Sequence, residues 1–130
     1  MKFVNPTGKD IRNDAGGAGH FGAGRGNRRH DGVDFSADTG QVVVAFHSGL
    51  IPSESLPYGD DLRWRGVNLV NNRIETKMWY LDPFPEVIGA WVEAGQPIGT
   101  AQNIGLKYKG VTPHVHVRIV KCDPMLLLDE

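Results

Sequence analysis

The sequence has a single cysteine, almost no net charge and no long apolar run. Cys122 has no partner for an internal disulfide or a thiolate zinc site, and a lone cysteine is more often a small buried apolar residue than a nucleophile. The formal net charge of -1 provides no overall field that would attract nucleic acid. No segment approaches the roughly 18 apolar residues of a membrane span, and the first residues carry no export-signal pattern. We therefore expect no disulfide scaffold, no nucleic-acid partner and no membrane insertion.

The length of 130 residues fits one domain with one hydrophobic core. We expect this single domain to span residues 1–130. Residues 1–29 have little periodicity and many glycine, asparagine and aspartate residues, which predicts an irregular N-terminal arm. The oligomeric state stays open at this level.

After the arm, short β-branched or aromatic runs alternate with turn residues. They span residues 41–46, 66–70, 74–81, 98–102 and 114–120. Asn71, Asn72 and Arg73 join the second run to the third as a hairpin turn would. The nearest approach to a helical period, residues 85–94, is interrupted by Gly89. The pattern predicts an all-β, antiparallel fold with long functional loops.

Residues 16–35, GGAGHFGAGRGNRRHDGVDF, contain seven glycines. Residues 17–22 form a GxGxxG string, which binds dinucleotides only between a strand and the start of a helix. Neither element is predicted here, so we reject nucleotide binding. The glycines instead favour an arm that wraps across a cleft, where larger side chains would block an extended substrate.

His114 and His116 lie in the run PHVHVRI. Alternation along a strand places both imidazoles on one face and the intervening valines on the other, with the imidazoles ~6.6 Å apart along the strand. One histidine can then bind a metal while the other reaches a metal-bound water. The alternative is a pair of exposed strand histidines.

His30 and Asp34 form an HxxxD pattern around Gly32. In a straight strand they would be ~13 Å apart, whereas a bend at Gly32 lets both side chains face one ion. A turn with an Asx-type hydrogen bond is the alternative for this segment alone. Together with one histidine of the distal pair, the pattern gives three ligands and leaves a fourth tetrahedral position for water, as in a catalytic zinc site.

The HxxxD pattern, the following QVVVAFHSGLI, the later EAGQPIG and the terminal HxH resemble, in order and spacing, the lysostaphin-type zinc metallopeptidases. The resemblance covers residues 21–120. It implies a compact antiparallel β-sheet groove whose loops wall a zinc cleft. It also implies Zn²⁺ ligands at His30, Asp34 and His116, with His114 as the active-site histidine. The implied substrates are the stem or bridge peptides of bacterial peptidoglycan.

The chain departs from the family at Tyr80. The family has a further histidine in a Tyr-x-His-Leu motif, where this chain reads MWYL; an ungapped alignment places Tyr80 there, and a shift of two places Asp82. The runs KMWYLDP and PHVHV resemble the leukocyte cell-derived chemotaxin branch, which binds zinc without established peptidase action. A phenol can donate a hydrogen bond to an oxyanion, but it titrates near ~10 and is a poor base at neutral pH. The alternative for Tyr80 is a half-buried strand aromatic.

Other polar and aromatic residues admit both a functional and a structural interpretation. His20 is expected to be a solvated loop residue and His47 a turn residue outside the metal site. An arginine cluster precedes His30 and is either a solvated loop or a clamp for substrate carboxylates: Arg25, Arg28 and Arg29. The tryptophans either line a groove or pack in the core: Trp64, Trp79 and Trp91.

These patterns lead to two hypotheses. The first is a zinc-dependent endopeptidase that hydrolyses peptidoglycan cross-links. With no export signal or wall-targeting module in the sequence, we expect a phage product, either an endolysin that passes from the host cytoplasm to the cell wall or a virion-associated domain. The second is a catalytically silent zinc-binding module of the same fold that binds the wall or a partner, a reading motivated by Tyr80.

Overall fold

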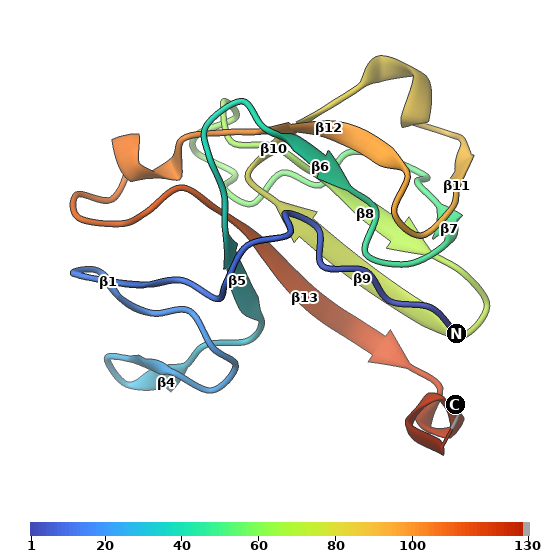
Figure 1. Cartoon of the computed structure of the whole chain (residues 1–130), viewed down its shortest axis with the longest axis horizontal. Coiled ribbons are helices and arrows are strands. Elements are labelled where there is room, and N and C mark those ends of the chain that lie inside the picture. The colour runs from blue at the N-terminus through green and yellow to red at the C-terminus, as the bar shows by residue number, and fades with distance from the viewer. Residues whose placement is uncertain (129–130) are drawn as a thin grey trace.

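The computed structural model describes residues 1–128, and the all-β prediction is confirmed. Strands and three short 3-10 segments are the regular elements of these residues (Figure 1). The strands are β1 (Asn13–Asp14), β2 (Gly17–Ala18), β3 (Gly24–Arg25), β4 (Arg28–Arg29), β5 (Val33–Ser36), β6 (Val42–Val44), β7 (Gly49–Leu50), β8 (Gly66–Val70), β9 (Ile74–Trp79), β10 (Leu81–Pro83), β11 (Trp91–Val92), β12 (Pro97–Ala101) and β13 (His114–Cys122). The 3-10 segments are η1 (Pro85–Val87), η2 (Ile104–Leu106) and η3 (Pro124–Leu128).

Two antiparallel sheets enclose the main core. One has six strands in the order β11-β7-β8-β9-β13-β5, and the other has three in the order β10-β12-β6. The fully buried core side chains include Val43, Leu69, Met78, Ile98 and Val115. Burying each such side chain contributes about 1.5–3 kcal/mol, so this core is the main source of the fold's stability. None of the helical segments in residues 1–128 has the length and apolarity needed to cross a bilayer.

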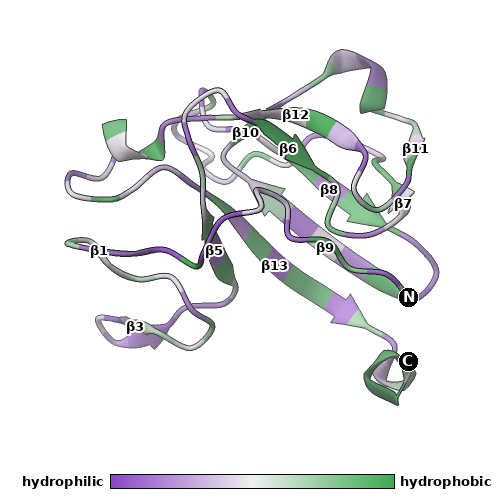
Figure 2. Ribbon diagram, viewed as in Figure 1, coloured by the Kyte–Doolittle hydropathy of each residue, from purple (hydrophilic) through white to green (hydrophobic). Residues whose placement is uncertain are grey.

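Strand β13 shows how the sequence positions the site. Val115 and Val117 are buried in the core, and the alternation of a strand turns His114 and His116 to the opposite face. Apolar and polar residues alternate along this strand in Figure 2. The histidine face is also buried, because the N-terminal arm covers it.

The N-terminal arm contains two minimal hairpins, β1–β2 and β3–β4, joined by loops. They lie beside β5 and β13 in Figure 1 and are largely hydrophilic in Figure 2. The arm is bonded to β5 through the backbone: Arg12 N–H donates to the Asp34 carbonyl, and Asp34 N–H donates to the Gly19 carbonyl, each at 2.8 Å. A Cβ at Gly19 would lie 2.7 Å from Cβ of Asp34, so this close approach requires glycine.

The predicted hairpin turn at residues 71–73 is confirmed. Val70 pairs with Glu75, and Asn71 N–H donates to the Ile74 carbonyl at 3.0 Å. The run predicted as one strand, residues 74–81, is instead two strands in different sheets. Strand β9 ends at Trp79 and β10 begins at Leu81. The chain changes sheets at Tyr80, whose φ is 76°, the one positive value at a non-glycine residue among those described.

Cys122 was expected to be buried, and this expectation was wrong. The residue lies at the end of β13 and is exposed. The burial pattern of β13 explains the difference, because the strand is buried only from His114 to Val117 and its last residues extend beyond the core.

Candidate active site

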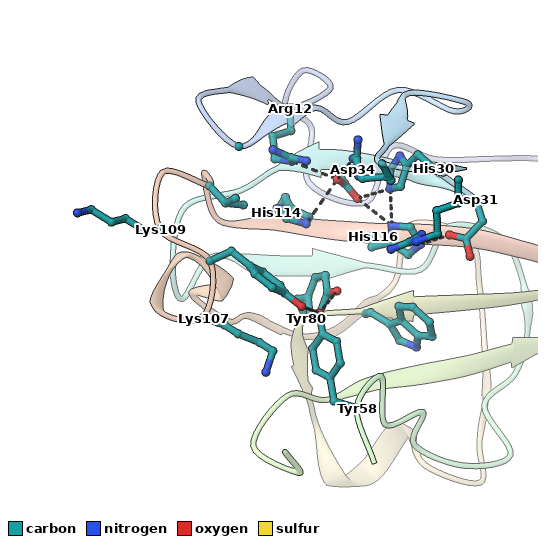
Figure 3. Close-up of a pocket in the computed structure, with 16 residues that line it drawn as sticks. Arg12, His30, Asp31, Asp34, Tyr58, Tyr80, Lys107, Lys109, His114 and His116 are labelled. Carbon is teal, nitrogen blue, oxygen red and sulfur yellow. Dashed lines mark hydrogen bonds and ion pairs between the residues drawn. The ribbon is translucent and has the colours of Figure 1, made fainter. Parts of the chain in front are cut away.

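Three side chains from opposite ends of the chain meet on the buried face of β13. His30 precedes β5, Asp34 belongs to β5, and His116 lies opposite Asp34 in the register of β5 and β13. Nδ1 of His116 is 2.8 Å from Oδ1 of Asp34 and 3.1 Å from Nε2 of His30. Nε2 of His30 is 3.3 Å from the same Oδ1. The structure thus places two imidazole nitrogens and one carboxylate oxygen around one point (Figure 3).

The three atoms fit the ligand set of a zinc ion. Zinc bonds of ~2.0–2.2 Å to nitrogen and oxygen in a tetrahedron separate neighbouring ligands by roughly 3.3 Å. The observed separations of 2.8, 3.1 and 3.3 Å are close to this edge length. Two neutral imidazoles with one carboxylate, leaving one position open, is the donor set of catalytic rather than structural zinc sites.

Hydrogen bonds to backbone carbonyls set the tautomers of two histidines. Nδ1 of His30 lies 3.0 Å from the His20 carbonyl, and Nδ1 of His114 lies 2.8 Å from the Thr112 carbonyl. A carbonyl only accepts, so each Nδ1 carries the proton when the ring is neutral, and each Nε2 presents its lone pair. The lone pair of His30 faces the ligand cluster, as in metal-binding histidines held from behind.

His116 is held differently, because its Nδ1 faces the cluster. Its Nε2 is buried and lies 3.2 Å from Oδ1 of Asp31, at an angle outside hydrogen-bond geometry. The nitrogen therefore has no hydrogen-bond partner within residues 1–128. The Asp31 carboxylate is the acceptor that a proton on Nε2 would reach after a small rotation. The ring also stacks on Trp79, with centroids 5.3 Å apart and an interplanar angle of 19°.

The electrostatics of the site favour the neutral forms of His30 and His114 beside an ionised Asp34. Burial raises the pKa of Asp34, but the hydrogen bond from His116 and the neighbouring histidines outweigh it and lower the pKa to about 2. Burial lowers the pKa of His30 and of His114, and the charge of Asp34 opposes that shift only in part. Deprotonated ligands are the form that binds a metal.

Gly32 bends the chain between His30 and Asp34, as predicted, but the need for glycine has another cause. Its φ is not positive; instead, a Cβ there would lie 2.3 Å from the Val117 carbonyl oxygen and 2.8 Å from Cε1 of His116. The missing side chain lets this bend pack directly against β13 and the His116 ring.

Arg12 belongs to the site although its sequence context did not indicate it. Its guanidinium is buried and its Nε donates to Oδ2 of Asp34 at 3.1 Å. Its Nη1 donates to Oδ1 of Asp14 at 2.7 Å and to the Gly17 carbonyl at 3.1 Å. Arg12 therefore holds the carboxylate oxygen that faces away from His30 and His116.

A cleft of about 690 Å³ opens beside the cluster. His114 and Tyr80 line it, with their rings edge to face and centroids 5.3 Å apart. Nε2 of His114 lies 3.6 Å from Oδ2 of Asp34, so His114 stands next to the ligand cluster. The tyrosines lie across the cleft from His30 and Asp34 in Figure 3.

Tyr80, rather than Asp82, occupies the cleft. The burial of β9 alternates, with Thr76 and Met78 buried, so a continued strand would turn residue 80 into the core. The positive φ of Tyr80 breaks this alternation and turns its side chain into the cleft wall. Asp82 is half exposed and pairs with Arg65 at 3.3 Å, outside the residues that line the cleft.

The other candidates divide between the cleft and the rest of the molecule. Arg25, Arg28 and Trp79 line the cleft. The following do not: Arg29 (exposed), Trp91 (exposed), Trp64 (buried beside Tyr80) and His20 (exposed, present only through its carbonyl). His47 is fully buried and bonded to the Ser48 carbonyl and to Oγ1 of Thr76, which is a structural role.

The fold and this cleft define a metallopeptidase-type β-sheet groove. The chain belongs to peptidase family M23, whose sequence pattern matches residues 28–125 and so includes the three cleft histidines and Asp34. Leukocyte cell-derived chemotaxin-2 from mouse is 32% identical over 117 residues, which cover 85% of this chain and 71% of that protein. These findings confirm the resemblance to the family and to its chemotaxin branch.

Solved structures show the same fold. The catalytic domain of the antimicrobial peptidase lysostaphin from Staphylococcus simulans has a TM-score of 0.58 and 26% identity, covering 92% of this chain and 93% of that domain. Csd3 from Helicobacter pylori has a TM-score of 0.67 at 20% identity, and the match covers 98% of this chain. It covers 33% of Csd3, so this chain spans a third of that protein's length.

Proposed function

We propose that the protein is a zinc-dependent endopeptidase that hydrolyses peptide cross-links of bacterial peptidoglycan. The observation that carries this proposal is the meeting of His30, Asp34 and His116 beside His114 at the edge of an open cleft. Likeness to the lysostaphin catalytic domain supports the substrate class. The phage setting and the cellular location stay predictions from the sequence.

His30, Asp34 and His116 are the residues that would hold the ion. Zinc bound there supplies Lewis acidity towards a substrate carbonyl and lowers the pKa of water. His114 is assigned as the proton acceptor, because its Nε2 lone pair lies at the cluster while Thr112 holds its Nδ1 proton. Its lowered pKa keeps that lone pair free at neutral pH.

Tyr80 is assigned as the donor to the oxygen of the scissile carbonyl as charge develops there. Burial raises the pKa of Tyr80 to about 12, so the hydroxyl keeps its proton and acts as a donor rather than a base. This assignment places the proton acceptor and the hydrogen-bond donor in two different residues whose rings touch at the cleft edge.

The second candidate is a zinc-binding module of the same fold without turnover. Two observations favour it: the tyrosine at position 80 and the 32% identity to mouse chemotaxin-2. A mass-spectrometric digest of purified peptidoglycan by zinc-loaded protein separates the two candidates. We expect new peptide termini from the wild type and none from His114→Ala. Identical digests from both proteins would eliminate the peptidase.

A further inference from the structure

Three tyrosine hydroxyls form a continuous chain along the cleft wall opposite the ligand cluster. Tyr108 follows η2, Tyr58 lies in the loop between β7 and β8, and Tyr80 joins β9 to β10. The Tyr108 hydroxyl donates to Oη of Tyr58 at 2.7 Å, and Oη of Tyr58 lies 2.8 Å from Oη of Tyr80. All three residues line the cleft, and Tyr58 and Tyr80 can be followed in Figure 3.

Counting protons gives this chain a direction. Each hydroxyl has one proton, and Tyr108 directs its proton at Tyr58. The Tyr58 proton is then available for Oη of Tyr80, which leaves the Tyr80 proton directed at the cleft. Tyr58 is the one hydrogen-bond partner of the Tyr80 hydroxyl within residues 1–128. Burial raises the pKa of both Tyr58 and Tyr80, so these two hydroxyls keep their protons at neutral pH.

The chain is held rigidly. The rings of Tyr58 and Tyr80 are stacked with centroids 6.2 Å apart, and Nζ of Lys107 lies 4.6 Å above the Tyr58 ring. At Tyr80, the backbone N–H donates to the Arg65 carbonyl at 2.7 Å, and the carbonyl accepts from Gln102 N–H at 2.9 Å. A positive φ at a bulky residue costs free energy and persists where surrounding contacts over-determine it, as they do here.

We propose that Tyr58 and Tyr108 are positioning residues that direct the Tyr80 O–H into the cleft, where it binds an oxygen of a tetrahedral anion. A hydrogen bond accepted by a hydroxyl polarises its own O–H and strengthens the bond it donates. In this relay, the hydroxyl chain from Tyr108 through Tyr58 to Tyr80, the Tyr80 phenol is a stronger hydrogen-bond donor to a negatively charged oxygen. The proposal rests on the proposed function for the zinc-loaded cleft, but its test measures anion binding rather than turnover.

The test uses inorganic phosphate as the tetrahedral anion and the zinc-loaded full chain, with the dissociation constant measured by calorimetry at constant ionic strength. Tyr80→Phe is expected to weaken phosphate binding about tenfold, the effect of losing a hydrogen bond to a charged group. Tyr58→Phe is expected to weaken phosphate binding about threefold or more, because it removes the hydroxyl that is hydrogen-bonded to Tyr80 and polarises it. The double variant Tyr58→Phe/Tyr80→Phe is expected to match Tyr80→Phe alone, because the relay acts only through Tyr80.

Zinc content and thermal midpoint are measured for every variant, and Trp91→Phe, an exposed aromatic outside the cleft, is the matched control. Wild-type affinity in Tyr58→Phe, or additive losses in the double variant, would overturn the relay. Absence of phosphate binding by the wild type would overturn it as well. Intact phosphate binding with the expected coupling, in a protein that releases no peptides from peptidoglycan, would support the relay and refute only the proposed turnover.

Discussion

Arg12 and Asp34 form a buried ion pair in which the two oxygens of the Asp34 carboxylate have different partners. Nε of Arg12 donates to Oδ2 at 3.1 Å, while Oδ1 faces His30 and His116 at 3.3 and 2.8 Å. The Arg12 and Asp34 side chains are only 4% and 3% exposed, respectively. The N-terminal arm therefore orients one oxygen of the carboxylate, and the other is the oxygen that would bind the proposed zinc ion. The arm thus orients a candidate ligand as well as forming part of the cleft wall.

Arg12→Met is expected to destabilise the metal-free protein by about 3 kcal/mol, because the change removes the nearer of the two arginines at the buried Asp34 carboxylate and leaves only Arg25, at 3.8 Å. Zinc should reduce the loss, since an ion at Oδ1 compensates the same charge. Urea unfolding with chelator and with saturating zinc measures both values. Arg63→Met, which removes an exposed arginine paired with Asp61, should have little effect in either condition. An Arg12→Met loss that is equal with and without zinc would contradict this account.

Asp31→Asn is expected to weaken zinc binding about tenfold, within the range for residues that orient a metal-binding histidine from behind. The reason is the 3.2 Å approach of Oδ1 of Asp31 to Nε2 of His116, which otherwise has no acceptor within residues 1–128. Competition with a chromophoric chelator measures the affinity. Asp38→Asn removes an exposed carboxylate on another loop and is the control. Equal affinities in the two variants would show that Asp31 does not orient His116.

Parts of the candidate site could be predicted from the sequence because the relevant patterns are local; the assignment of His30, Asp34 and His116 as zinc ligands stays a prediction. Alternation along β13 places His114 and His116 on one face whatever the tertiary fold, and a bend at Gly32 brings His30 and Asp34 together within five residues. Strand β8 was likewise predicted with its observed bounds, since its run begins at Gly66 and is followed directly by the turn residues Asn71 and Asn72. The meeting of His116 with His30 and Asp34, by contrast, depends on the pairing of β13 with β5.

The missing parts of the site depend on tertiary contacts. Arg12, Tyr58 and Tyr108 lie in loops without periodicity. Packing of the arm, of the loop between β7 and β8 and of the loop after η2 brings them to the cleft. The division of residues 74–81 into two strands was also missed, because the run IETKMWYL contains no glycine, proline or other turn residue and the change of sheet depends on the pairing of β10 with β12. The positive φ of Tyr80 follows from that change of sheet.

Gly32→Ala is expected to lower the free energy of unfolding by about 1–3 kcal/mol, as overpacking does. Its Cβ would lie 2.3 Å from the Val117 carbonyl oxygen and 2.9 Å from Nε2 of His116, so the strand or the ring must move. Zinc affinity should fall with it. Gly24→Ala is the matched control, since a Cβ there meets no atom within 4 Å. Equal urea midpoints for the two variants would contradict the packing role assigned to Gly32.

The metal-free protein is expected to lose stability as the pH falls from 7 to 5. Burial lowers the pKa of His30, His47 and His114 below the ordinary value of 6.5, so the unfolded chain binds protons first and is favoured as the pH drops through that value. His47→Gln removes one of these groups outside the metal cluster. The slope of the unfolding free energy against pH should then decrease by an amount that corresponds to less than one bound proton. Urea unfolding midpoints in the presence of chelator at several pH values measure this loss of stability. A midpoint that rises on acidification would contradict the predicted direction.

Tyr80→Phe is expected to reduce turnover on peptidoglycan about 100- to 1000-fold, the usual effect of removing one donor to a developing oxyanion. The ring and its stacking on Tyr58 remain, so zinc content and thermal midpoint should change little. Tyr80→His restores an N–H donor at the same position and should retain turnover within about tenfold of the wild type, because the role requires a donor rather than a phenol. Peptide release per unit time by mass spectrometry measures all three proteins. Full activity in Tyr80→Phe would mean that the cleft stabilises the oxyanion without the hydroxyl, and the positive φ of Tyr80 would then have only a packing explanation.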